Sequence, residues 1–211
     1  MIKLTVDNRP LSIKEGTTLL QACLNNDIYA PNLCFMEAMD HPPASCRLCF
    51  VEIEGMDGPH TACTVEVKEG MVVRTDAPAV RHLQRTGLKL LLSSHDVDCG
   101  HCSANKRCEM QRMAAFLKVG LKPKRLDRFA KKEDGEEEHP LLRYFPNRCV
   151  LCGKCLYTCR VRHNKPFMTF AKRGIDTVIS FYGNDATDLT CMDCLACVEI
   201  CPVAAIAAKK K

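Results

Sequence analysis

The amino-acid sequence predicts an α+β protein built from three small modules in series. Short alternating strands with one helix occupy the first third, and a helical pattern that carries a histidine and three cysteines follows. A duplicated cysteine motif fills the C-terminal part. These three observations place the modules at residues 1–76, 77–121 and 146–211, with a charged linker at 122–145.

The first module is predicted to be mainly β-structure. Residues 2–6 alternate in the manner of a strand, and a turn at 7–10 leads into a second arm at 11–13. Thr18 and Gln21 have the spacing of a capping box, which predicts a short helix to about residue 25. Further strands are expected at 49–53, 61–67 and 71–75.

The second module is predicted to begin with a helix from Ala77. Val80, Leu83, Gly87 and Leu91 share one apolar stripe, and this helix leads the chain towards residue 95. The charged stretch at 122–139 predicts a solvated linker, with a docking surface as the alternative. Beyond it, residues 167–171 and 175–181 are expected to form a hairpin.

Cysteine is the leading compositional feature, with 16 among 211 residues. The N-terminus has no basic segment followed by an apolar one, and no apolar run approaches the ~20 residues that span a bilayer. We therefore expect a cytoplasmic protein without membrane insertion, whose cysteines bind metal rather than form disulfides. The net charge of +5 is mild, Trp is absent and the aromatic residues do not follow the basic ones, so nucleic-acid binding is not expected.

The strongest motif is a repeat of Cys-x2-Cys-x2-Cys-x3-Cys. Three cysteines of such a run hold one cubane cluster, and the fourth serves the other cluster. A zinc knuckle would have no use for the third and fourth cysteines at this duplicated spacing. The repeat predicts two [4Fe–4S] clusters, one on Cys149, Cys152, Cys155 and Cys201 and the other on Cys159, Cys191, Cys194 and Cys197.

A different cysteine pattern lies in the first module. One isolated cysteine, one Cys-x2-Cys pair and one distant cysteine on a following strand is the order of a [2Fe–2S] site on a β-grasp ferredoxin, although the spacing departs from the plant-type run. The turn-forming segment 42–45 suits a loop folded closely over the sulfurs, and backbone N–H groups in such a loop can stabilise the negative charge of the cluster. The predicted ligands are Cys34, Cys46, Cys49 and Cys63.

The third ligand set contains a histidine. Three cysteines leave a [4Fe–4S] cluster one ligand short, and a histidine at the end of the preceding helix can complete it. His101 is the rival, but it lies too close to its flanking cysteines to share their cluster. The predicted ligands are His95, Cys99, Cys102 and Cys108.

The order of these motifs resembles the N-terminal iron–sulfur region of [FeFe]-hydrogenases and of the large peripheral subunit of respiratory complex I. The segments 74–76, 108–111 and 148–155 resemble the family's sequence around these clusters. A chain that stops soon after Cys201 is most similar to the small diaphorase-type subunits of NAD-linked hydrogenases and formate dehydrogenases, and to subunits of electron-bifurcating complexes. The complete C-terminal repeat favours the hydrogenase-like and bifurcating types.

This resemblance implies an iron–sulfur subunit that relays electrons within an oxidoreductase complex. Its expected partners are a flavin- and NAD(P)H-binding subunit and a further catalytic redox subunit. No dinucleotide or P-loop fingerprint occurs, so we expect no catalytic residue, no further cofactor site and no active site of the chain's own. Two alternatives are a free multicluster ferredoxin that acts as a soluble shuttle, and a redox-sensing regulatory module.

Overall fold

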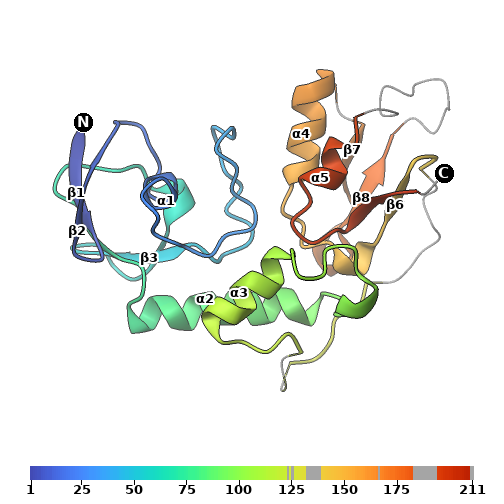
Figure 1. Ribbon diagram of the computed structural model, residues 1–211, viewed down its shortest axis with the longest axis horizontal. Helices are drawn as coiled ribbons and strands as arrows, with labels where there is room; N and C mark the ends of the chain where they lie inside the picture. The colour runs from blue at the N-terminus through green and yellow to red at the C-terminus, as the bar shows by residue number, and fades with distance from the viewer. Residues whose placement is uncertain (123, 125, 132–138, 166, 183–193, 210–211) are drawn as a thin grey trace. The chain divides into compact units, whose positions relative to one another are not determined.

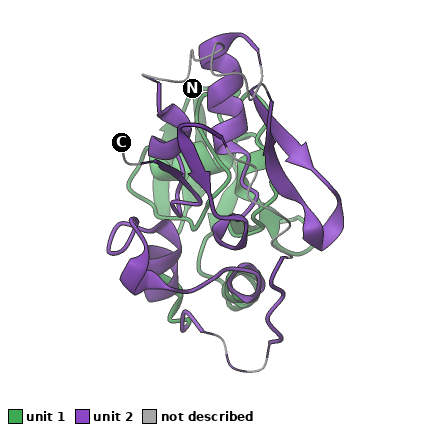
Figure 2. Ribbon diagram, turned by 90° about the vertical axis from the view of Figure 1, so that its right-hand side faces the viewer, with its two compact units in different colours: residues 1–89, 116–119 green, residues 90–115, 120–211 purple. Residues whose placement is uncertain are grey.

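The computed structural model describes residues 1–122, 124, 126–131, 139–165, 167–182 and 194–209. It is a mixed α+β structure of small sheets and short helices, as the sequence predicts in outline (Figure 1). The chain divides into two compact units, one of residues 1–89 and 116–119 and the other of residues 90–115 and 120–211 (Figure 2). Among the described helices, none is long and apolar enough to cross a membrane.

The first unit contains a five-stranded sheet. Its strands are β1 (Ile2–Val6), β2 (Arg9–Ile13), β3 (Phe50–Ile53), β4 (His60–Thr61) and β5 (Val72–Arg74). They lie in the order β2-β1-β5-β3-β4. β1 and β5 run parallel, with Thr5 opposite Val72, and the other neighbours are antiparallel. The predicted N-terminal hairpin is confirmed, and Asp7 and Asn8 take up the positive φ angles that its tight turn requires.

Helix α1 (Leu19–Leu24) shares a hydrophobic core with this sheet. Thr18 caps it as predicted, because its hydroxyl accepts the N–H of Gln21 at 3.3 Å. The other half of the capping box is not formed, since the Gln21 amide donates to Asn25 instead. Cys23 lies on the inner face of the helix and is fully buried, which agrees with its predicted place in the core.

The strand predicted at 61–67 is wrong. β4 ends at Thr61, and a 3₁₀ turn, η1 (Ala62–Thr64), follows it. The N–H of Ala62 donates to the carbonyl of Cys49 at 2.8 Å, so the chain turns in towards the start of β3. The alternation of apolar residues is a misleading signal here, because the segment serves to turn the Cys63 side chain inward rather than to extend the sheet.

Helix α2 (Pro78–Ser93) confirms the predicted helix, with proline at its first position. Val80 and Leu88 on its apolar side are fully buried. After α2 the chain forms η2 (Cys99–His101) and α3 (Glu109–Leu117).

The C-terminal part of the second unit holds two small antiparallel sheets. β6 (Leu142–Tyr144) pairs with β9 (Ile206–Ala208), and β7 (Met168–Ala171) pairs with β8 (Val178–Phe181) as the predicted hairpin. The helices are α4 (Lys154–His163) and α5 (Ala196–Glu199), with 3₁₀ turns η3 (Pro146–Arg148) and η4 (Gly174–Asp176). β6 lies inside the segment expected to be linker, and the predicted module boundaries stay predictions.

Candidate iron–sulfur centres

The described cysteines are all free thiols. Fifteen of the sixteen lie in the described residues, and no disulfide joins any of them. Cys191, a predicted ligand of the last cluster, lies outside the described residues. The four predicted ligand sets can therefore be followed in space for every member except this one.

The four predicted ligands in the first unit form two close pairs. The sulfurs of Cys34 and Cys46 are 3.4 Å apart, and the thiols of Cys49 and Cys63 are hydrogen-bonded to each other. All four side chains are buried. A [2Fe–2S] cluster takes two thiolates on each of its two irons, so two adjacent pairs of thiols fit this cofactor.

The loop around Cys34 favours a charged sulfur. Besides the thiol of Cys46, the backbone N–H groups of Ser45 and Cys46 donate to the Cys34 sulfur, and together these bonds lower the pKa of Cys34 to about 5. The hydrogen bond with Cys34 and burial raise the pKa of Cys46. The left-handed backbone of Ala44 and Arg47 curls the loop into this shape. Such inward-pointing amides are the means by which a loop stabilises a negative cluster.

Helix α2 supports the same loop at two points. A Cβ atom on Gly87 would lie 2.7 Å from the carbonyl oxygen of Arg47, so only glycine lets the helix approach this closely. One turn earlier, the buried amide of Gln84 donates to the carbonyl of Phe50 at 3.0 Å. These contacts fix the backbone on both sides of Cys49.

The two rival histidines of the third set have different surroundings. The Nδ1 atom of His95 lies 2.9 Å from the carbonyl oxygen of Arg148, and burial lowers the pKa of this half-buried ring. A histidine that binds a metal commonly donates its other ring N–H to such a carbonyl, which leaves Nε2 for the metal. His101 is exposed, and its Nδ1 pairs with Asp98 at 3.0 Å. Nδ1 is engaged in both rings, so the burial of His95, against the exposure of His101, is the feature that favours His95 as the ligand.

The cysteines of the third set lie around η2 and the start of α3. Cys99 and Cys102 lie at the two ends of η2 and are partly exposed, whereas Cys108 is buried directly before α3. Burial raises the pKa of Cys108, but the N–H groups of Met110 and Gln111 at the helix N-terminus act against this rise. A helix N-terminus stabilises a thiolate in this way. Cys99 and Cys102 are close enough to Cys108 to influence its charge.

The first cubane set combines three cysteines of the first run with Cys201, the last cysteine of the second run. The charges of Cys152, Cys149, Cys201 and Cys197 all act on Cys155, so cysteines from both runs of the repeat lie near one another, and the division into two ligand sets stays a prediction. Burial raises the pKa of Cys152 to about 12. The hydroxyl of Tyr144 is hydrogen-bonded to the Cys149 sulfur and accepts the N–H of Ile179 at 3.1 Å.

The second cubane set lines a small cavity between α4 and α5. Cys159, Cys194 and Cys197 are among its lining residues, together with His163 and Met168. The guanidinium of Arg162 donates to the Cys194 sulfur at 3.6 Å. The fourth predicted ligand, Cys191, is the one outside the described residues, so this set is seen in part.

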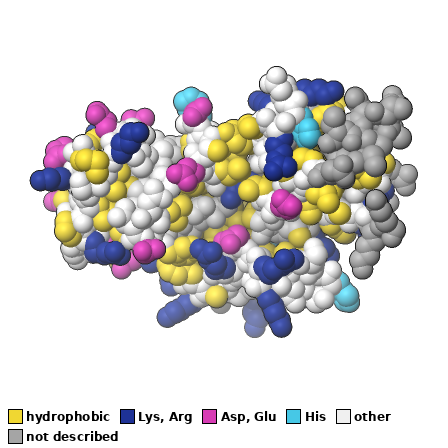
Figure 3. Space-filling model, turned by 45° about the horizontal axis from the view of Figure 1, so that its top comes forward, with side chains coloured by type: hydrophobic (Ala, Val, Ile, Leu, Met, Phe, Trp, Pro, Cys, Tyr) yellow, Lys and Arg dark blue, Asp and Glu magenta, His cyan; other side chains and the backbone are white. Residues whose placement is uncertain are grey.

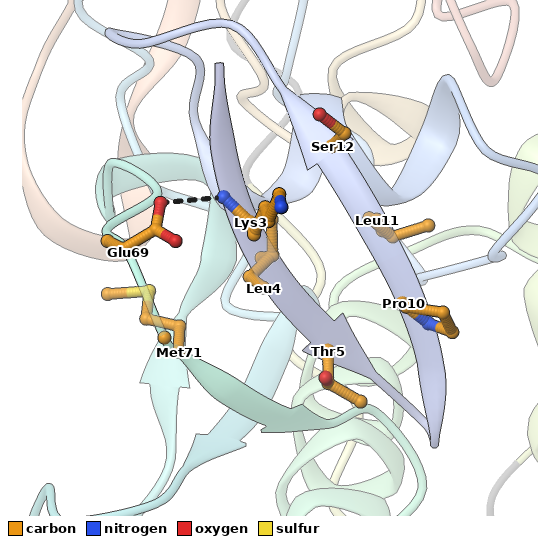
Figure 4. A pocket seen from close by; sticks show the side chains of 9 residues that line it. Lys3, Leu4, Thr5, Pro10, Leu11, Ser12, Glu69 and Met71 are labelled. Atoms are coloured by element: carbon orange, nitrogen blue, oxygen red, sulfur yellow. Dashed lines mark hydrogen bonds between the residues drawn. The ribbon is translucent and has the colours of Figure 1, made fainter.

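Among the described His, Cys, Asp and Glu residues, no three converge as they would on a single metal ion. A hollow of about 410 Å³ lies along β1, β2 and the turn before β5 (Figure 4). It contains the hydrogen bond from the Lys3 N–H to Glu69 at 2.8 Å and is lined by no cysteine or histidine.

Sequence reasoning missed two residues beside the first cubane set. Tyr144 lies in the segment expected to be linker, and Lys131 belongs to the charged stretch for which the sequence predicts a solvated surface. The Lys131 side chain is instead buried, with 6% of the residue's surface exposed. No periodicity or motif could have found either residue, because their positions depend on the pairing of β6 with β9 and on a contact with η3.

The family comparisons agree with the site geometry. Residues 1–78 match the model of the 2Fe-2S iron-sulfur cluster binding domain. Residues 84–121 match that of the NADH-ubiquinone oxidoreductase-G iron-sulfur binding region. The chain thus carries regions of the 2Fe–2S and 4Fe–4S kinds.

Relatives match along almost the whole chain. It is 33% identical to a NADH-quinone oxidoreductase subunit of Rhizobium meliloti and 31% identical to NADPH-Fe(3+) oxidoreductase subunit alpha of Geobacter sulfurreducens, over 98% and 99% of its length. It is 29% identical to NADP-reducing hydrogenase subunit HndD of Solidesulfovibrio fructosivorans over 98%. The chain spans only 24%, 24% and 36% of these relatives.

A solved structure resembles the chain more completely. A chain of an NAD+-reducing [NiFe]-hydrogenase in the H2-reduced state superposes with a TM-score of 0.83 and 28% sequence identity. The match covers 99% of this chain and 87% of that chain. The resemblance predicted from the cysteine motifs is therefore confirmed.

Proposed function

Since this chain is related over its whole length to iron–sulfur subunits of NADH- and NADPH-linked oxidoreductases and hydrogenases, we propose that it is an electron-relay subunit of such a complex. It passes single electrons between a flavin- and NAD(P)H-binding subunit and a further redox subunit of the hydrogenase, formate dehydrogenase or bifurcating type. Its expected location is the cytoplasm.

One observation carries this proposal. The described thiols other than Cys23 lie near other thiols at three places, in the [2Fe–2S] loop, around η2 and in the C-terminal repeat, and this clustering supports the proposed ligand sets. A disulfide-stabilised protein would pair these sulfurs covalently. A redox sensor would need only one such group of thiols. Several groups in one chain fit the transfer of electrons from cluster to cluster better.

The proposed cofactors are one [2Fe–2S] and three [4Fe–4S] clusters. The parallel pairing of β1 with β5 and the packing of α1 support a β-grasp ferredoxin module around the first cluster. The paired strands and hairpin around α4 and α5 support a two-cluster ferredoxin-like module at the C-terminus. The ligands are those predicted from the sequence, with His95 as the fourth ligand of the third set.

When bound, the clusters supply one-electron redox chemistry, and the chain supplies their spacing and surroundings. Buried thiols and inward-pointing amides keep water away from the first site. The hydrogen bond between the His95 ring and the carbonyl of Arg148 joins the third set to the residue directly before Cys149. This contact supports a path for electrons between two successive cluster sites of the second unit.

The mixed surface suits a subunit better than a nucleic-acid binder. On the face shown in Figure 3, acidic and basic side chains are interspersed, with hydrophobic patches between them. Large apolar side chains such as Val161, Phe170 and Ile175 are exposed on or near the C-terminal hairpin and are available to a partner subunit.

Metal content and electron acceptance test the proposal together. The anaerobically purified chain should contain about 14 iron atoms, two from the [2Fe–2S] cluster and four from each of the three others, with matching acid-labile sulfide. Dithionite should reduce its clusters, whereas NADH should reduce them only when a flavin-containing partner is added. A content of only a few metal atoms per chain, chiefly zinc, would refute the cluster assignment. Rapid reduction by NADH in flavoprotein-free material would refute the relay role.

A further inference from the structure

Lys131 is fixed beside the first cubane set by its own backbone. Its N–H donates to the side-chain oxygen of Asn147 at 2.7 Å, and its carbonyl accepts from the Asn147 amide at 3.4 Å. Asn147 belongs to η3, two residues before Cys149. The reciprocal pair of hydrogen bonds therefore attaches Lys131 to the entrance of the cysteine loop, although the two segments are 16 residues apart in the sequence.

The side chain of Lys131 is buried without a visible acceptor. Only 6% of the residue is exposed, and its ammonium nitrogen has no hydrogen-bond partner among the described residues. Removing an ammonium group from water costs several kcal/mol in real proteins unless a partner compensates for the loss. Structures rarely keep such a group unless an acceptor occupies the space that it faces.

Cys149 interacts electrostatically with this buried ammonium group. Burial lowers the pKa of Lys131, and the negative charge of the Cys149 thiolate acts in the opposite sense. Reciprocally, the Lys131 charge lowers the pKa of Cys149, which burial alone would raise. The buried ammonium and the first sulfur of the cubane set thus lie within electrostatic reach of each other, in a site that solvent screens poorly.

We propose that Lys131 tunes the [4Fe–4S] cluster on Cys149, Cys152, Cys155 and Cys201: its ammonium group donates to this cluster's sulfur and raises its reduction potential. The inference depends on the ligand set under the proposed function. A reducing electron adds negative charge to a cluster that four thiolates already make negative. A buried positive charge beside it stabilises the reduced form more than the oxidised form.

Redox titration followed by electron paramagnetic resonance on the full, cluster-loaded chain tests this inference. Lys131→Met removes the charge and the donor but keeps an unbranched side chain. At a fixed applied potential we expect the ratio of reduced to oxidised cluster to fall at least tenfold, about 59 mV for a one-electron couple. The change should affect one cubane signal only, with unchanged iron content. Lys131→Arg, which keeps the charge, should recover most of the ratio.

Two further variants control the result. Lys209→Met removes an exposed lysine of the same unit and should leave every signal unchanged. Cys149→Ser should alter the same signal that Lys131→Met shifts. Unchanged potentials in Lys131→Met, or a shift in a different signal, would overturn the role of Lys131.

If Lys131→Met fails to retain iron, Lys131→Gln answers the same question against Lys131→Arg. The inference is supported if the cluster potential shifts in Lys131→Gln and stays at the value of the unchanged chain in Lys131→Arg. Equal potentials in the two variants overturn it. If Cys149→Ser leaves every cubane signal intact, the ligand assignment itself is wrong and this inference fails with it.

Discussion

His95 and His101 are separated by six positions, and burial is the feature that distinguishes them as candidate metal ligands. Nδ1 of His95 is engaged by the Arg148 carbonyl, and its half-buried ring is left with Nε2 for coordination. His101 uses its Nδ1 to bind Asp98 at the exposed surface, and this hydrogen bond lowers the pKa of the Asp98 carboxyl. Nε2 is left over in both rings, but only the His95 ring is shielded from solvent.

Substitution of the two histidines should separate these roles. His95→Cys should keep four irons in its cluster and lower the potential, because a thiolate replaces a neutral imidazole. His95→Ala should convert that cluster to a three-iron form, a loss of about one iron in 14 by the same cluster count. Iron analysis and electron paramagnetic resonance would measure both effects.

His101→Ala is the matched control and should leave the spectrum and the iron content unchanged. If instead the His101 variant loses the cluster and the His95 variant keeps it, then α2 merely ends near the site and His95 has a structural role.

At the scale of elements, α2 acts as a support for the [2Fe–2S] loop. The sequence predicts its apolar stripe and the place of Gly87 on that stripe, but it gives no reason for a glycine there. The reason is the carbonyl of Arg47, which comes closer to the helix than any Cβ atom would permit. Sequence periodicity identifies the buried face of a helix but not the atom packed against it.

Gly87→Ala should therefore weaken the binding of the [2Fe–2S] cluster, even though alanine favours helices. An alanine in a helix normally stabilises it by up to about 1 kcal/mol relative to glycine. Here the new methyl group forces the loop between Cys46 and Cys49 to move, at a cost of about 1–3 kcal/mol. We expect a faster loss of the [2Fe–2S] signal under mild chelation, with the cubane signals unchanged.

Gly120→Ala provides the comparison, because a Cβ at this position would meet no atom within 4 Å. It should leave the chelation rate of the [2Fe–2S] cluster unchanged. A Gly87→Ala protein with equal or greater cluster lifetime would show that the close approach has no functional consequence.

The elements that the sequence predicts correctly depend on local chemistry. The N-terminal hairpin follows from Asp7 and Asn8, the cap of α1 from Thr18, and α2 from its regular apolar stripe. The strand at 61–67 is wrong because the long-range contact between Ala62 and the Cys49 carbonyl decides its conformation. The cysteine sets follow from spacing, since a cluster imposes its own geometry on nearby ligands, and they stay a prediction.

The surroundings of the sites are less predictable than the ligands. Lys131 occurs next to Lys132 in a run of charges, a pattern that usually indicates a solvated surface. Its burial depends on the reciprocal hydrogen bonds with Asn147, which no single-sequence signal indicates. A residue with the role that we propose for Lys131 is therefore found only when the fold brings distant segments together.

At the scale of the whole molecule, the two units differ in how much their cores depend on the cluster sites. The main core of the first unit contains eighteen buried described residues, of which Cys49 and Cys63 are predicted ligands. The core of the C-terminal part contains eight, of which Cys155 and Cys159 are predicted ligands, and its described sheets have only two strands each. Two-stranded sheets have little stability of their own.

Removal of the clusters should consequently unfold residues 148–202 before the N-terminal sheet. Bound metal contributes folding free energy directly, and a small core loses a larger share of its stability with it. After anaerobic chelation, hydrogen exchange read by mass spectrometry should show deprotection of α4 and β7–β8, while β1, β2 and α1 stay protected. Chelated protein in which α4 and the β7–β8 hairpin keep their protection would mean that packing, rather than the clusters, holds this part of the chain together.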